Sequence, residues 1–217
     1  MQWLTGGFAA LLMTALYYGT QYLVEKKYEL NYKRTGRWIT DRSVLAFGAI
    51  SFAGILAVSI LHLPEENAVA FIRDLILLWG MAVLAVIDKK KQLIPNQVLM
   101  LLFQLWVTVT GLYILFHVSE GVALLFRSLA GAIVSGIIFF ACYLISRGQM
   151  GAGDVKLSVV LGLYLTGERI IGAILYGTLL CLLYSLIQLA RKKLTLKSGV
   201  PMAPFLYLGT LITLLIL

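Results

Sequence analysis

Eight long stretches with few or no charges divide the 217-residue chain, and they dictate its fold class. They lie at about residues 3–24, 43–63, 70–87, 97–118, 122–146, 155–166, 170–190 and 203–217. Most of them reach the roughly 20 residues that a helix needs to cross a bilayer, and 60% of all residues are hydrophobic. The pattern predicts an all-α polytopic membrane protein, a bundle of about eight transmembrane helices of which two are short.

The positive charges alternate with these stretches. Of the 18 Lys and Arg residues, 15 fall in the loops that follow the first, third, fifth and seventh stretches. This distribution follows the positive-inside rule and predicts that these four loops face the cytoplasm. The net charge of +8 is then explained by topology and by anionic lipid headgroups, so membrane lipids, and not nucleic acid, are the expected partners.

The connections predict one integral-membrane domain over residues 1–217. The only sizeable polar loop covers residues 25–42, which is too short for a folded domain. The N-terminus lacks a basic region and a cleavage signature, so we expect the first stretch to be retained as a helix. Cys142 and Cys181 both lie in apolar stretches, without a CxxC pair or nearby histidines. We therefore predict no disulfide framework, no metal site and no cofactor.

Two carboxylates lie at the edges of apolar stretches. Asp88 ends the third stretch, and Asp154 closes the glycine-rich break Gly151-Ala152-Gly153-Asp154 before the sixth. Taken alone, Asp154 is a good N-cap for a helix over residues 155–165, and Asp88 is an interfacial charge compensated by the lysines at 89–91. Carboxylates at a membrane are costly, however, and by default they mark a functional site.

Topology places both carboxylates at one membrane face, because the fourth and fifth stretches leave that face and return to it. The sixth stretch rises only about 18 Å, so its start is expected inside the protein or beside a wetted, thinned face. Gly151 and Gly153 suit such a break, which predicts a water-accessible cleft. Two close carboxylates share a proton, so one can activate water while the other polarises a peptide carbonyl. This pairing predicts an aspartyl protease.

Three motifs follow one another at successive cytoplasmic helix ends, and they resemble the type IV prepilin peptidase family over about residues 70–217. They are Asp88 with Leu93-Ile94-Pro95-Asn96, then Met150-Gly151-Ala152-Gly153-Asp154-Val155-Lys156-Leu157, then Val200-Pro201-Met202-Ala203-Pro204-Phe205-Leu206. The resemblance implies an intramembrane endopeptidase of the bacterial cytoplasmic membrane, with Asp88 and Asp154 as its catalytic pair. It would remove the short basic leader from prepilins or pseudopilins at the cytoplasmic face, typically after a glycine.

The remaining motif residues have ordinary structural explanations as well as site-shaping ones. Physics alone makes Pro95-Asn96 a turn and helix cap, Pro201 and Pro204 helix-start prolines, and Lys156 a snorkelling interfacial lysine. The resemblance implies that these residues, with Gly151 and Gly153, shape the site. Larger family members carry an insertion with two CxxC pairs and N-methyltransferase activity. Residues 25–42 hold no cysteine, so we expect peptidase activity without methylation and without zinc.

Two other functions stay open at this point. A small transporter could use Asp88 and Asp154 as a proton relay, although transporters often show paired helix breaks and here there is one. A relative of presenilin or signal peptide peptidase would share GxGD and a proline-containing third motif, but the surroundings of Asp88 fit prepilin peptidases better. Because the loops and the prepilin leaders are both basic, recognition is expected to rest on the hydrophobic helix after the cleavage site, docked between membrane helices.

Overall fold

Eight helices form the part of the chain that the computed structural model describes, namely residues 2–28, 41–62, 68–146, 150–192 and 199–217. They are α1 (Gln2–Tyr28), α2 (Arg42–His62), α3 (Ala68–Lys91), α4 (Asn96–Phe116), α5 (Val118–Ile145), α6 (Ala152–Tyr164), α7 (Glu168–Ala190) and α8 (Ala203–Ile216). Within these residues there is no strand, and α2, α3, α4, α5 and α7 are long and apolar enough to cross a membrane. The predicted all-α polytopic membrane fold is confirmed, with α6 and α8 as its short helices.

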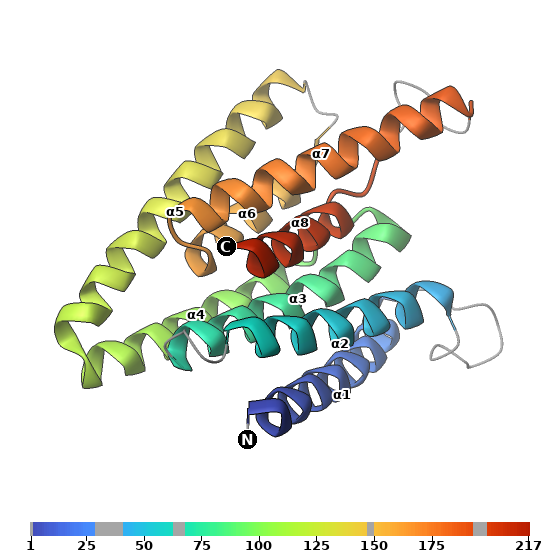
Figure 1. Ribbon diagram of the computed structural model, residues 1–217. Helices are drawn as coiled ribbons and strands as arrows, with labels where there is room; N and C mark the ends of the chain where they lie inside the picture. Colours follow the sequence, from blue (N-terminus) through green and yellow to red (C-terminus); the bar gives the residue numbers. More distant parts are fainter. Residues whose placement is uncertain (1, 29–40, 63–67, 147–149, 193–198) are drawn as a thin grey trace.

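Helix α3 lies at the centre of the bundle (Figure 1). It packs against α1, α2, α4, α6 and α8, and it is buried along most of its length from Arg73 to Asp88. A helix that is apolar all round belongs in such a position. Helices α4, α5 and α7 instead leave large apolar side chains exposed, as lipid-facing helices do. The central helix therefore carries Asp88 on a rigid, buried support.

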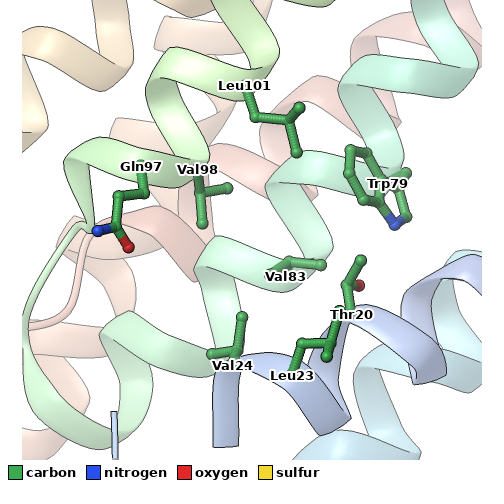
Figure 2. A pocket seen from close by; sticks show the side chains of 8 residues that line it. All are labelled: Thr20, Leu23, Val24, Trp79, Val83, Gln97, Val98 and Leu101. Atoms are coloured by element: carbon green, nitrogen blue, oxygen red, sulfur yellow. The ribbon is translucent and has the colours of Figure 1, made fainter. Parts of the chain in front are cut away.

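An apolar groove of about 200 Å³ separates α1 from the start of α4 (Figure 2). Trp79 and Val83 of α3 form its floor, and it is closed by Thr20, Leu23 and Val24 of α1 and by Gln97, Val98 and Leu101 of α4. We call it the α1–α4 groove. Its lining comes from α1, α3 and α4, so it does not reach the helix that carries Asp154.

Small residues allow α5 and α6 to approach closely. A Cβ atom on Gly131 or on Gly162 would overlap the backbone carbonyl of the other residue. The hydroxyl of Ser135 donates to the carbonyl of Ser158 at 2.8 Å across the same contact. Helices in lipid gain little from apolar association and rely on close packing and interhelical hydrogen bonds, which this contact supplies. It holds α6 firmly against α5.

Replacing Gly162 with Ala should therefore destabilise the protein by about 1–3 kcal/mol, the usual effect of forcing a methyl group into a packed contact. Gly111, in the middle of α4, has open space around it and is the matched control. Gly111→Ala should leave the stability unchanged or raise it slightly, because alanine favours a helix. Thermal unfolding in detergent measures both changes, and equal melting temperatures for the two variants would contradict the packing argument.

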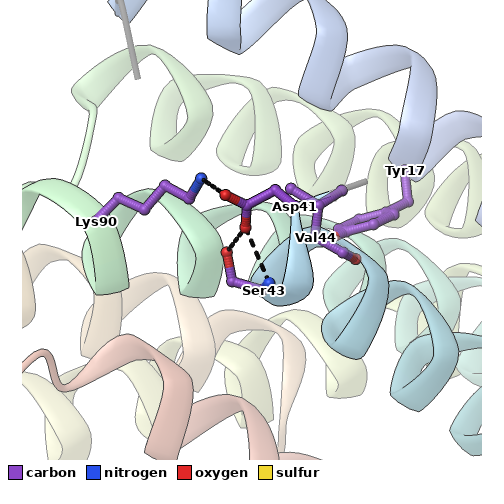
Figure 3. Close-up of polar contacts among 5 residues, drawn as sticks. All are labelled: Tyr17, Asp41, Ser43, Val44 and Lys90. Carbon is purple, nitrogen blue, oxygen red and sulfur yellow. Dashed lines mark hydrogen bonds and ion pairs between the residues drawn. The ribbon is translucent and has the colours of Figure 1, made fainter. Parts of the chain in front are cut away.

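The start of α2 is fastened to the end of α3 (Figure 3). Asp41 immediately precedes α2, where its carboxylate accepts hydrogen bonds from the Ser43 amide at 2.9 Å and from the Ser43 hydroxyl. Its other oxygen pairs with Lys90 Nζ at 2.7 Å. Tyr17 of α1 donates to the carbonyl of Val44 beside it. Helices α1, α2 and α3 thus come together near Lys90, which lies two residues after Asp88.

The Asp41 contact predicts a loss of stability in acid. Partial burial raises the pKa of Asp41, but the hydrogen bonds from Lys90 and Ser43 and the Lys90 charge outweigh it and hold the pKa at about 2. Its ordinary value is about 3.9, so the folded state favours the ionised form. The contribution of the Asp41 contact to the free energy of unfolding is complete above about pH 5 and disappears as the pH falls through about 2. Melting temperatures of the native protein and Asp41→Asn should accordingly differ at pH 5 and converge towards pH 2.

Candidate functional site

Asp88 lies in the last turn of α3, and only 4% of its surface is exposed. Its Oδ2 atom accepts a hydrogen bond from the Ala203 amide at 2.8 Å, and the Met202 amide donates to the same carboxylate. These are the amides at the start of α8, which have no partner within their own helix. The end of α3 disfavours a carboxylate, but the positive end of α8 compensates for it. The fold thus stabilises a buried carboxylate at this point.

The third motif explains why α8 begins beside Asp88. Pro204 is the second residue of α8, where a proline fits because its missing N–H would have had no helical partner. Pro204 is buried, and Pro201 is partly buried in the segment leading to the helix. The segment that holds both prolines therefore contacts Asp88 through the Ala203 amide.

Asp154 is the third residue of α6 and is partly buried. The prediction that it caps a helix starting at Val155 was wrong, because Gly151 occupies the N-cap position with extended backbone angles. The helix begins three residues earlier than the apolar pattern indicated. From its first turn the Asp154 carboxylate accepts a hydrogen bond from the Gly151 amide, and the Asp154 amide donates to the Gly151 carbonyl at 3.1 Å. This reciprocal arrangement resembles half of a capping box.

The two carboxylates lie close enough for the charge of Asp88 to act on Asp154. The loop between α3 and α4 approaches the same helix start, since a Cβ atom on Gly153 would lie 3.0 Å from Cβ of Ile94. A larger residue than glycine at 153 would push α6 away from this loop. Gly151, by contrast, is exposed, and a Cβ atom there would meet the Asp154 carboxylate at an ordinary 3.4 Å. Gly153 therefore lets the start of α6 lie close to the loop between α3 and α4.

Lys156 joins the first motif to the second. Its Nζ atom donates to Oδ1 of Asn96 at 3.1 Å, across 60 residues of sequence. Asn96 is the first residue of α4, and Pro95 before it has extended backbone angles. The described partner of Lys156 is thus a neutral amide and not one of the two aspartates. This contact ties the start of α4 to the start of α6 at the candidate site.

Sequence reasoning missed two residues that position these elements. Gln92 takes a left-handed backbone conformation, φ 50°, directly after α3, and its side-chain amide donates to the Gly199 carbonyl at 2.8 Å. Arg73, near the start of α3, donates from Nη2 to the carbonyls of Leu163 and Tyr164 at 2.7 and 2.9 Å. Gln92 has no signal in the sequence. Arg73 has one, because it is a charged residue within the apolar stretch at residues 70–87.

Arg73 explains how the protein accommodates a helix as short as α6. Thirteen residues rise only about 20 Å, so the last carbonyls of α6 end inside the bundle and need donors there. The buried guanidinium supplies these donors and also donates to the Ser128 hydroxyl at 3.0 Å. The cation lies at the negative end of the α6 dipole, where it is favourable. One end of α6 therefore meets Arg73 and the other approaches Asp88, both on α3.

The chemical groups at the site are two carboxylates and backbone amides. No group of three or more His, Cys, Asp or Glu residues that could hold a metal ion occurs among the described residues. Cys142 and Cys181 are free, the first exposed and the second partly buried. These two acids, with a helix start that is exposed at Gly151 and Ala152, are the groups available for chemistry at this end of the bundle.

Comparison with known proteins gives one match. The model of the type IV leader peptidase family matches residues 75–186, slightly more than half of the chain. This segment includes Asp88, Asp154 and the residues around them, and it ends before the third motif. No match was found among curated proteins or among solved structures.

Proposed function

This chain belongs to the type IV leader peptidase family, and we propose that it is an intramembrane aspartyl endopeptidase with Asp88 and Asp154 as its catalytic pair. Its substrates would be type IV prepilins or prepilin-like proteins, from which it removes the short basic leader. The observation that carries the proposal is the approach of a buried carboxylate at the end of α3 to a partly buried one at the start of α6.

The proposed chemistry needs one proton shared by the two acids. The ionised carboxylate takes a proton from a water molecule while the water oxygen bonds to the peptide carbonyl carbon. The protonated carboxyl donates its proton to the carbonyl oxygen, so the tetrahedral intermediate is neutral. Collapse of this intermediate breaks the C–N bond. The leaving amine receives the proton that came from the water, and one hydroxyl of the intermediate returns its proton to the other carboxylate, which restores the singly protonated pair. No metal or cofactor takes part in this scheme.

We place the site at the cytoplasmic face of a bacterial cytoplasmic membrane. The lysines at 89–91 directly follow Asp88 and form the last turn of α3, and a concentration of positive charge at the end of a membrane helix favours the cytoplasmic side. A protease at this face would meet basic leaders before the rest of the substrate crosses the membrane. Because residues 25–42 contain no cysteine, we propose that the protein cleaves without methylating the product.

Co-reconstitution with a prepilin in liposomes tests the function. The substrate carries a basic leader, a glycine at the junction and the apolar segment that follows, and mass spectrometry identifies the new N-terminus. We expect cleavage after the glycine, and weaker cleavage when a bulky residue replaces it. Absence of cleavage by the folded protein across several prepilins would contradict the proposal. Proton flux, measured with a pH-sensitive dye in the same liposomes, would then indicate a proton-relay transporter.

A further inference from the structure

A pocket lined by charged residues lies at the end of the bundle opposite the candidate catalytic pair. It encloses about 430 Å³, within the range of pockets that bind small ligands. We call it the α3–α5 pocket, because α3, α4 and α5 line it with Val69 and Ala70, with Tyr113, and with Glu120 and Arg127. From Ala70 to Asp88, α3 rises about 27 Å, so the pocket lies too far away to take part in the proposed cleavage.

Two opposite charges line this pocket without pairing with each other. Glu120 and Arg127 are seven residues apart on α5, which places them on one face of the helix, about 10 Å apart along its axis. The Glu120 carboxylate accepts a hydrogen bond from the Tyr113 hydroxyl at 2.6 Å. Within the part of the chain that the structure describes, Arg127 forms no ion pair. The pocket therefore presents a cation and an anion that are both available to one ligand.

The surroundings of the pocket place it against lipid. Leu115, Phe116 and Val118, around the turn between α4 and α5 at the lower left of Figure 1, are each at least 65% exposed. The pocket itself lies where α3 begins and α4 ends, which is the level of the headgroups when these helices span a bilayer. An arginine in a membrane helix without a protein counter-ion is costly unless its long side chain reaches a polar group at the interface. Charge and position both favour a lipid headgroup as the ligand.

We propose that the α3–α5 pocket binds the headgroup of an ethanolamine phospholipid, with the lipid phosphate on Arg127 and the lipid ammonium on Glu120. A guanidinium binds phosphate oxygens through two parallel hydrogen bonds, and an ammonium has three N–H donors for a carboxylate. Tyr113 donates to Oε2 of Glu120, so Oε1 accepts the ammonium. One zwitterionic headgroup neutralises both charges, whereas a simple anion or a simple cation neutralises one of them.

Native mass spectrometry of the protein released from micelles tests the headgroup preference. The micelles contain equal amounts of phosphatidylethanolamine and phosphatidylcholine, which share a phosphate and a net charge, but choline has no N–H to donate. We expect roughly fivefold more phosphatidylethanolamine than phosphatidylcholine on the native protein, because a charge-assisted hydrogen bond distinguishes the two. Glu120→Gln keeps an acceptor for Tyr113 and loses the charge, so its two occupancies should become equal. Equal occupancies on the native protein, or an unchanged preference in Glu120→Gln, would overturn the proposal.

Glu168→Gln is the matched control for Glu120. Glu168 is an exposed carboxylate in the first turn of α7 and does not line the pocket, so this variant should keep the native preference. Loss of the preference in Glu168→Gln would show that any carboxylate at this end of the bundle produces it, which contradicts a defined site.

Arg127→Met tests the phosphate contact. It should carry roughly a tenth of the native amount of phosphatidylethanolamine, because the charge-assisted pair is lost. Its melting temperature in lipid-free micelles should equal that of the native protein, which separates loss of lipid from unfolding. Native occupancy in this variant would exclude Arg127 as the phosphate ligand. Free phosphoethanolamine at the same concentration should leave the bound lipid in place, and displacement of the lipid would assign the pocket to a soluble ligand instead.

Discussion

Asp88→Asn and Asp154→Asn are each expected to lower kcat/KM for leader removal roughly 10³-fold or more, since a positioned acid or base contributes about 10²–10⁴ to a rate. Asparagine keeps the size of aspartate and can accept a hydrogen bond, but it cannot hold or transfer the shared proton. The double variant should be no worse than the poorer single variant, because residues that act as one unit are not additive. Quantitative mass spectrometry of the released leader measures all three variants.

The control for this prediction is Asp41→Asn. It removes a carboxylate at the same end of the bundle, but one that caps α2 and pairs with Lys90. Cleavage by this variant should stay near the native rate at neutral pH. Melting temperatures check that the two dyad variants fold, since Asp88 also binds the amides that begin α8. Cleavage within tenfold of native by a folded Asp88→Asn or Asp154→Asn protein would contradict the dyad.

The architecture could be predicted because a bilayer imposes its own length on apolar segments. The stretch at residues 97–118 became α4 (Asn96–Phe116), and the stretch at 170–190 became α7 (Glu168–Ala190). Charged residues are expensive in the membrane, so charge-free runs report helices directly. The same reasoning indicated that α6 is short and that Asp88 and Asp154 share one end of the bundle.

The local geometry of the site could not be predicted, because it depends on helices distant in sequence. The apolar pattern does not show which of several neighbouring residues is the N-cap of α6, and in the structure this residue is Gly151. The amides that stabilise Asp88 come from α8, 115 residues away along the chain. The sequence motifs indicated which segments meet. They did not indicate that the Asp88 carboxylate accepts hydrogen bonds from the first amides of α8, which have no partner within their own helix.

Helix α3 organises the site through both of its ends. Asp88, near one end, binds the start of α8 and approaches the start of α6, and Arg73, near the other end, binds the last carbonyls of α6. About 22 Å of helix separates the two positions on α3, and α6 itself is about 20 Å long. The position of Asp154 relative to Asp88 thus depends on a contact at the far end of the same helix pair.

Arg73→Met should lower the free energy of unfolding by about 3 kcal/mol or more, making it the most destabilising single change that we predict. The methionine fills similar space but leaves the Leu163 and Tyr164 carbonyls and the Ser128 hydroxyl without their donor. Each buried group left unpaired costs about 1–3 kcal/mol. Arg73→Lys should recover part of the loss, because an ammonium donates hydrogen bonds but lacks the planar fork of a guanidinium. Unfolding in mixed micelles, followed by tryptophan fluorescence, measures these differences.

Arg127→Met is the matched control for Arg73, because Arg127 is exposed on α5, one residue before Ser128. The free energy of unfolding of this variant should lie within about 0.5 kcal/mol of the native value, because substitutions at exposed positions usually have small effects. If Arg73 also positions α6, cleavage by Arg73→Lys should fall further than its loss of stability explains, through a lower kcat at temperatures where the variant is fully folded. Equal stabilities of the methionine variants at positions 73 and 127 would show that α6 does not depend on the buried guanidinium, and an unchanged kcat in Arg73→Lys would restrict Arg73 to stability alone.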